Sequence, residues 1–142
     1  MTGENESIVR RIADAASQSS TVDEFMADVG ALLHPEVEYI NPPDAIETGT
    51  RKGLTGMKLV FTSIIEGAGS DGSIEITQLI GRGEYVFHRG LITVRGSASG
   101  IEVPGRSFGL VTTFRDGLVF RMEWFWDEGE AFALFEERTR EN

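Results

Sequence analysis

Hydrophobic positions recur every three or four residues in three stretches of the N-terminal half, as they do in amphipathic helices. Thr21 and Glu24 have the spacing of a capping box at the start of the second stretch. The dipeptide His34-Pro35 ends that stretch, because a residue before proline avoids the α region. The pattern therefore predicts helices over 8–17, 21–33 and 54–66.

Most of the remaining chain favours β-strands. A strand over 36–41 alternates, and because Glu36 and Glu38 share one of its faces, we expect Tyr39 and Asn41 to point inward from the other. Asp127 has the position of an N-cap for a short last helix that ends near Arg138. Further strands are predicted near 74–80, near 85–95 and on both sides of Asp116-Gly117.

The Asp116-Gly117 pair between two β-rich runs indicates a hairpin with a two-residue type I′ turn. Such a turn pairs Arg115 with Leu118 and places Gly109 opposite Trp124. Gly109 then indicates either a bulge or tight packing, or a space for a ligand beside the indole. One face of the second strand is wholly apolar and should line the core or a cavity: Leu118, Phe120, Met122, Trp124 and Trp126. The opposite, mixed face carries Val119, Arg121, Glu123, Phe125 and Asp127.

Segregated helices and strands predict one α+β domain over residues 1–142. The net charge of −10 argues against nucleic acids and anionic membrane surfaces as partners, and no run is apolar for long enough to span a membrane. The chain has no cysteine and only two distant histidines, so we expect no disulfide, no metal site and no cofactor. The polar N-terminus is unlike a signal peptide, which favours a cytoplasmic location.

Three segments carry a resemblance to a known family: HPEVEYINPPDAIETGTRKGLTGM, GIEVPGRSF and FRDGLVFRMEWFWDEGEAFALF. With this order of elements, the chain resembles SnoaL-like domains of the nuclear transport factor 2-like superfamily, which includes polyketide cyclases, ketosteroid isomerases, scytalone dehydratase and limonene epoxide hydrolases. The resemblance implies a cone-shaped, strongly curved mixed or antiparallel sheet, wrapped around three N-terminal helices, with a short C-terminal helix. It also implies a homodimer through the outer sheet face and a small apolar or polycyclic molecule bound inside the cone.

Only some of the catalytic residues of these relatives have counterparts in this chain. Asn41 stands where ketosteroid isomerases have their aspartate base, and an amide cannot shuttle a proton. Tyr39 and Asn41 match the water-holding pair of limonene epoxide hydrolases, and Arg89 falls near their arginine, but Leu91 and Trp124 replace their two aspartates. The last-strand acid of polyketide cyclases has its nearest counterpart in Glu123, on the face opposite Trp124 in the predicted register.

The catalytic candidates are Tyr39, Asn41, Arg89 and His88, of which only one of the neighbours His88 and Arg89 can line the cone. A surface or dimer-face position is the alternative for His88, and Asp44 is either a carboxylate over the cone mouth or a turn former. The predicted ligand-binding residues are Tyr39, Asn41, Phe61, Met122, Trp124 and Trp126. Two functions stay open: a cofactor-independent isomerase, cyclase, dehydratase or hydrolase, and a non-catalytic ligand-binding or dimerisation module.

Overall fold

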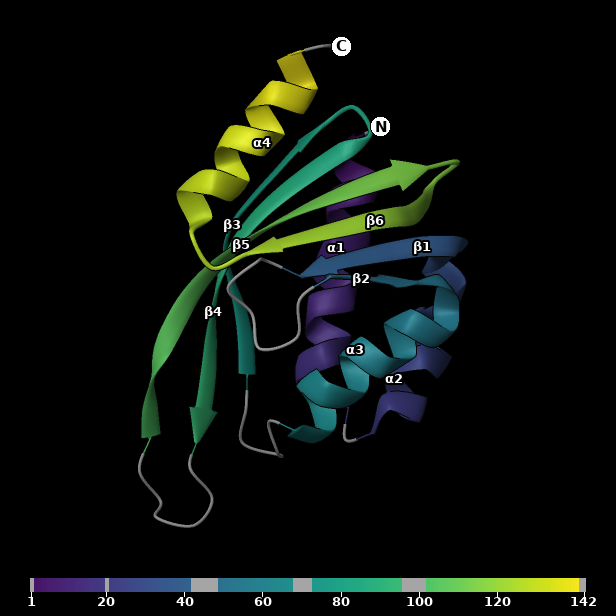
Figure 1. Cartoon of the computed structure of the whole chain (residues 1–142), viewed down its shortest axis with the longest axis vertical. Helices are drawn as coiled ribbons and strands as arrows, with labels where there is room; N and C mark the ends of the chain where they lie inside the picture. Colours follow the sequence, from purple (N-terminus) through teal and green to yellow (C-terminus); the bar gives the residue numbers. More distant parts are fainter. Residues whose placement is uncertain (1, 20, 42–48, 68–72, 96–101, 141–142) are drawn as a thin grey trace.

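The structure, a computed structural model, describes residues 2–19, 21–41, 49–67, 73–95 and 102–140. The helices in these ranges are α1 (Thr2–Gln18), α2 (Val22–Val29), α3 (Gly53–Gly67) and α4 (Glu128–Arg140), with a 3₁₀ turn, η1, over Gly30–Leu32. The strands are β1 (Leu33–Asn41), β2 (Gly49–Lys52), β3 (Ser73–Arg82), β4 (Tyr85–Arg95), β5 (Glu102–Arg115) and β6 (Leu118–Phe125). The predicted α+β class is confirmed (Figure 1).

The six strands form one strongly curved mixed sheet in the order β2-β1-β6-β5-β4-β3. Only β1 and β6 run parallel, and the other neighbours are antiparallel. Helices α1 to α3 lie on the inner face of the sheet, and α4 lies on the opposite, outer face (Figure 1). The sheet therefore has apolar layers on both sides. Strands near its middle bury successive residues, which point to opposite faces of the sheet.

The inner layer is the larger core. Phe25 and Val29 of α2, Met57 of α3 and Val37 of β1 have no exposed surface, and Phe25 stacks on Phe61 with 4.2 Å between ring centroids. The outer layer is smaller and joins four buried residues: Phe87, Val111, Ala131 and Phe135. The sheet is therefore packed between α1 to α3 on its inner face and α4 on its outer face.

Local signals account for several element boundaries. The Thr21 hydroxyl caps α2 by accepting a hydrogen bond of 3.2 Å from the backbone N–H of Glu24, as its position predicted. Helix α2 ends earlier than predicted, at Val29, and β1 begins at Leu33, so that Pro35 lies inside a strand instead of ending a helix. The polar β2 falls in a segment that the sequence assigned to a loop.

The hairpin turn is confirmed, but its predicted register is wrong beyond the first pairs. Asp116 and Gly117 both have positive φ angles, of 54° and 78°, and Arg115 pairs with Leu118. A β-bulge then leaves Phe120 without a partner, because Phe114 pairs with Val119 while Thr113 pairs with Arg121. The extra residue shifts every later pair by one.

The bulge divides the predicted apolar face. Met122, Trp124 and Trp126 do pack with the inner core, together with Val119, which had been assigned to the other face. Phe120 instead contacts the edge of the His34 ring and lies under the guanidinium of Arg115, 3.8 Å from its ring centroid. Leu118 is half-buried and belongs to neither core layer.

Of the two alternatives for Gly109, tight packing is confirmed, although its predicted partner Trp124 is wrong. Gly109 pairs with Phe125, and Leu110 is the residue opposite Trp124. A Cβ atom at Gly109 would lie 2.6 Å from the Cβ of Ala131 and 3.1 Å from the Cα of Glu128. The absence of a side chain therefore lets α4 approach the outer face of β5, and it opens no space beside the indole.

Candidate functional site

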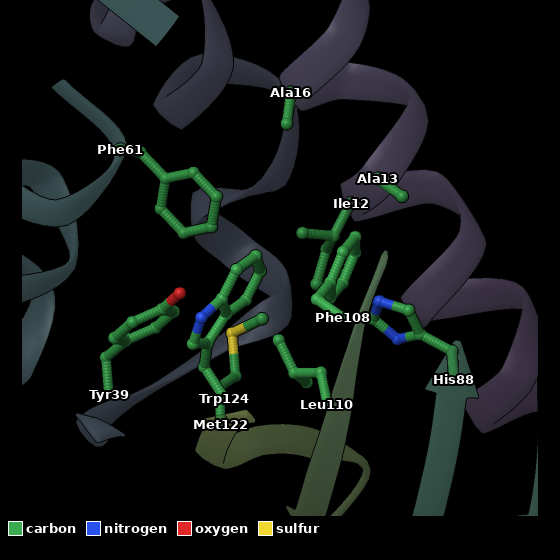
Figure 2. A pocket seen from close by; sticks show the side chains of 10 residues that line it. All are labelled: Ile12, Ala13, Ala16, Tyr39, Phe61, His88, Phe108, Leu110, Met122 and Trp124. Carbon is green, nitrogen blue, oxygen red and sulfur yellow. The ribbon is translucent and has the colours of Figure 1, made fainter. Parts of the chain in front are cut away.

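A cavity lies between α1, α3 and the inner face of the sheet (Figure 2). The cavity volume is about 40 Å³, which is room for a few water molecules. A larger ligand requires lining side chains to move, and the flexible thioether of Met122 is one that can. Ten residues line the cavity: Ile12, Ala13, Ala16, Tyr39, Phe61, His88, Phe108, Leu110, Met122 and Trp124.

The sheet register brings the floor of this cavity together. Trp124, Leu110 and His88 are successive partners across β6, β5 and β4, so their side chains form one row on the inner face. Tyr39 pairs with Met122 in the adjacent inner row. Residues separated by up to 85 positions in sequence thus face one hollow because of strand pairing alone.

Aromatic contacts build the wall of the cavity. Phe108 stacks on Trp124 with ring centroids 4.3 Å apart and 13° between the planes. The ring of Phe108 also lies across Gly90, where an added Cβ would be 2.8 Å from its Cζ. Gly90 therefore leaves the room in which this ring lies, and a side chain there would push the ring or the strand away.

His88 is the one titratable side chain among the cavity-lining residues besides Tyr39, and it is buried with 5% of its surface exposed. Its ring meets Phe108 edge-on at 5.5 Å, and its Nδ1 atom has no hydrogen-bond partner in the described part of the chain. Burial lowers the pKa of His88 from 6.5 to about 4, because the charged form loses its hydration. The imidazole is therefore neutral at pH 7.

Tyr39 contributes the only hydroxyl among the ten lining residues. Its ring is 4% exposed and meets Phe61 edge-on at 6.3 Å. Burial raises the pKa of the Tyr39 phenol above its ordinary value, so this group stays protonated at neutral pH. In Figure 2 the Tyr39 hydroxyl and the His88 imidazole approach the cavity from opposite sides.

The structure brings together some of the residues singled out in the sequence. Tyr39, Phe61, Met122 and Trp124 line the cavity, and of the neighbours His88 and Arg89 it is His88 that does so. His88 is thus a buried residue and does not lie on the surface.

Other predicted residues lie elsewhere. Asn41 is half-buried at the end of β1, where it pairs with Gly49, and it is not among the ten lining residues. Trp126 packs edge-on against Trp124, and the guanidinium of Arg106 lies 3.7 Å from the centroid of its ring. These positions place Trp126 behind the cavity wall. Asp44 falls outside the described residues.

Arg89 and Glu123 point to the outer face. The guanidinium of Arg89 lies 3.7 Å from the carboxylate of Glu128 in α4. Glu123 is 9% exposed and accepts two hydrogen bonds from the guanidinium of Arg138, one of them at 3.1 Å. Both residues therefore fasten α4 to the sheet, and Asp127 caps this helix by accepting a hydrogen bond of 2.8 Å from the N–H of Gly129.

The sequence reasoning missed five cavity-lining residues: Ile12, Ala13, Ala16, Phe108 and Leu110. The first three lie on the apolar stripe of the predicted first helix, whereas Phe108 and Leu110 lie on β5, where Gly109, Val111 and Thr112 are buried as well. Because helices cover both faces of this part of β5, alternation along the strand could not have shown that Leu110 and not Val111 faces the cavity.

No helix within the described ranges is long and apolar enough to cross a membrane. The same residues contain no group of three histidine, cysteine, aspartate or glutamate side chains placed to hold a metal ion.

A known protein family and several solved structures are similar to this chain. Residues 9–122 match the family model described as SnoaL-like domain, and no curated protein matches the chain. Bal32a, from a soil-derived mobile gene cassette, superposes with a TM-score of 0.73 at 18% sequence identity, over 94% of this chain and 97% of its own.

Two further solved structures share the fold. TerC, co-crystallised with polyporic acid, gives a TM-score of 0.68 at 22% identity, over 94% of this chain and 98% of its own. A proposed SnoaL-like polyketide cyclase from Jannaschia sp. CCS1 gives 0.69 at 17% identity, over 95% and 91%. At such identities the similarity establishes a common architecture, on which many different activities are found.

Proposed function

This chain belongs to the SnoaL-like domain family, and from that premise we propose that it binds a small apolar molecule in the cavity between α1, α3 and the sheet. We further propose that it converts this molecule as a cofactor-independent enzyme of the isomerase, cyclase, dehydratase or hydrolase kind. The observation that carries the proposal is the lining of the cavity, which is apolar except for Tyr39, His88 and the indole N–H of Trp124. A concave apolar site with a few convergent polar groups is typical of small-molecule binding.

The protonation states of the two ionisable groups suit a proton-transfer reaction. The neutral imidazole of His88 is able to accept a proton from a bound molecule, and the protonated Tyr39 hydroxyl is able to donate a hydrogen bond to an oxygen that gains negative charge. Because the two groups approach from opposite walls, they would act on different ends of one molecule (Figure 2). Polar groups so arranged support isomerisation or cyclisation of a carbonyl compound.

The relatives agree with this proposal at the level of the fold. TerC was crystallised with polyporic acid, and the Jannaschia protein carries the description of a polyketide cyclase. By analogy with these proteins, we propose that the ligand of this chain is a small apolar or polycyclic molecule.

Blocking the cavity tests the binding proposal. Toluene, titrated into the protein and followed by NMR, should bind to the wild type, while Ala16→Leu should abolish binding because the larger side chain enters the cavity from α1. Ala27→Leu is the matched control, since Ala27 is exposed on α2, and it should leave binding unchanged. Equal toluene binding by wild type and Ala16→Leu would contradict the cavity as the site.

A second function, ligand binding without catalysis, is favoured by one observation. None of the ten cavity-lining residues is an aspartate or a glutamate, so the site has no carboxylate base. Hydrogen–deuterium exchange at the methyl group of acetophenone in D₂O distinguishes the two functions. An enzyme that transfers protons should accelerate the exchange, and His88→Gln should remove the acceleration. Binding of acetophenone without any acceleration would favour the non-catalytic module.

A homodimer and a cytoplasmic location, both expected from the sequence and the family resemblance, remain predictions. Sedimentation of the full chain would measure its oligomeric state, and imaging of an epitope-tagged chain would show its location in the cell.

A further inference from the structure

The imidazole of His88 lies in the cavity without a partner for its polar edge. The side chain is 5% exposed, and no donor or acceptor in the described residues reaches its Nδ1 atom. Its cross-strand neighbours are Leu79 and Leu110, and Phe108 covers one side edge-on. A buried polar atom normally has a hydrogen-bond partner, so this position suits a polar group of a ligand.

The surroundings exclude a charged ligand group at this position. None of the ten cavity-lining residues is a lysine, arginine, aspartate or glutamate. Arg89, the next residue on β4, points to the outer face and lies beside Glu128. A carboxylate or an ammonium group in the cavity would therefore be buried without a counter-charge, which is costly.

The chemistry of the lining further restricts the class of ligand that fits the cavity. A neutral imidazole has one nitrogen that donates and one that accepts, and a hydroxyl group complements either, because it does both. Four of the ten lining residues are Tyr39, Phe61, Phe108 and Trp124, whose rings favour contact with another aromatic ring.

We propose that this cavity binds an uncharged aromatic molecule that carries a hydroxyl group, and that this hydroxyl forms a hydrogen bond with the imidazole of His88. The inference rests on the proposed function and specifies its ligand class. His88 is the residue that selects a hydroxyl over a methyl group of the same size. The adjacent wall of Phe108 and Leu110 holds the ring of the ligand beside it.

A matched pair of probes tests this selection. Phenol and toluene have nearly the same shape and differ in a hydroxyl against a methyl group. The ratio of phenol affinity to toluene affinity, measured by NMR titration, should fall by about tenfold in His88→Leu, which is the effect of one hydrogen bond to a buried group. The control His34→Gln changes the second histidine, half-buried near the start of β1, and should keep the wild-type ratio.

A direct spectroscopic measurement accompanies the affinities, in case His88→Leu does not fold. The imidazole nitrogen resonances of His88 in the wild type should shift with phenol and stay in place with toluene, while those of His34 respond to neither. An unchanged affinity ratio in His88→Leu, or imidazole resonances that phenol does not move, would overturn the inference. Toluene binding in the same experiment would leave the proposed apolar site standing, and failure of both probes to bind would contradict both proposals.

Discussion

Acidification should destabilise this protein through His88 between pH 6.5 and pH 4. In the unfolded chain the imidazole has its ordinary pKa of 6.5, whereas burial lowers the pKa to about 4 in the folded protein. Between these values the unfolded state binds the proton and the folded state does not, so the free energy of unfolding falls as the pH falls. Below pH 4 both states are protonated and the contribution stays lost.

The structure sets the size of this effect. The difference between a pKa of 6.5 and one of about 4 corresponds to roughly 3 kcal/mol of unfolding free energy at low pH, and the part lost between pH 7 and pH 5 is about 2 kcal/mol. Within the described residues, no charged side chain is in contact with His88 to offset this cost: Leu79 and Leu110 flank it on the sheet, and Glu6 of α1 packs on Gly81, which pairs with Val86. The side chain is 5% exposed, so solvent screens little of the cost.

Urea unfolding at pH 7 and pH 5 measures the effect. His88→Leu should lose about 2 kcal/mol less than the wild type over this interval, because leucine does not titrate. The two proteins contain the same carboxylates, and the comparison therefore isolates the change at position 88. A loss in His88→Leu equal to that of the wild type would refute the assignment of the effect to this imidazole.

Two further predictions concern the attachment of α4 to the sheet. Gly109→Ala should lower the free energy of unfolding by about 1–3 kcal/mol, because its Cβ would lie 2.6 Å from that of Ala131; Gly30→Ala, with only an ordinary contact of 3.8 Å, should change it little in the same urea titration. Arg138→Leu should cost about 3–5 kcal/mol, since it leaves the buried carboxylate of Glu123 without its partner, and adding Glu123→Gln should restore part of the loss. A single variant no less stable than the double one would contradict the ion-pair argument.

The helices and the hairpin turn could be predicted from the sequence because their signals are local. The Thr21 cap needs only the residues that follow it, and Asp116-Gly117 adopts positive φ angles in its own turn. The resemblance to SnoaL-like domains, carried by three segments, gave the architecture that these local signals could not.

The register of β6 could not be predicted, because the bulge at Phe120 leaves no local signal. Val119 and Phe120 are both apolar, so the alternation on either side of them is compatible with either face. Packing against β1 and β5 decides the outcome, and it places Val119 in the inner core and Phe120 outside it. The polar strand β2 was missed for a related reason, since three of its four residues are exposed and carry no hydrophobic period.

Whether His88 faces the cavity depends on α1 and α4, which are distant from it in the sequence and cover the two faces of β4. Phe87 and His88 are both buried, one under α4 on the outer face and the other under α1 on the inner face. Where both faces of a strand are covered, alternation of polar and apolar residues no longer reports which side is inside. The sequence alone therefore could not decide whether His88 or Arg89 faces the cavity. In the fold, Arg89 lies on the outer face beside Glu128 of α4.

The location of α4 limits how two copies of this protein could meet. Phe87 and Val111, on the outer face of β4 and β5, pack against Ala131 and Phe135, so a second copy could place its own strands on this part of the sheet only if α4 first left (Figure 1). Self-association over this part of the sheet and retention of the last helix are thus mutually exclusive, whereas the lengths of β4 and β5 that run past α4 carry no such restriction (Figure 1).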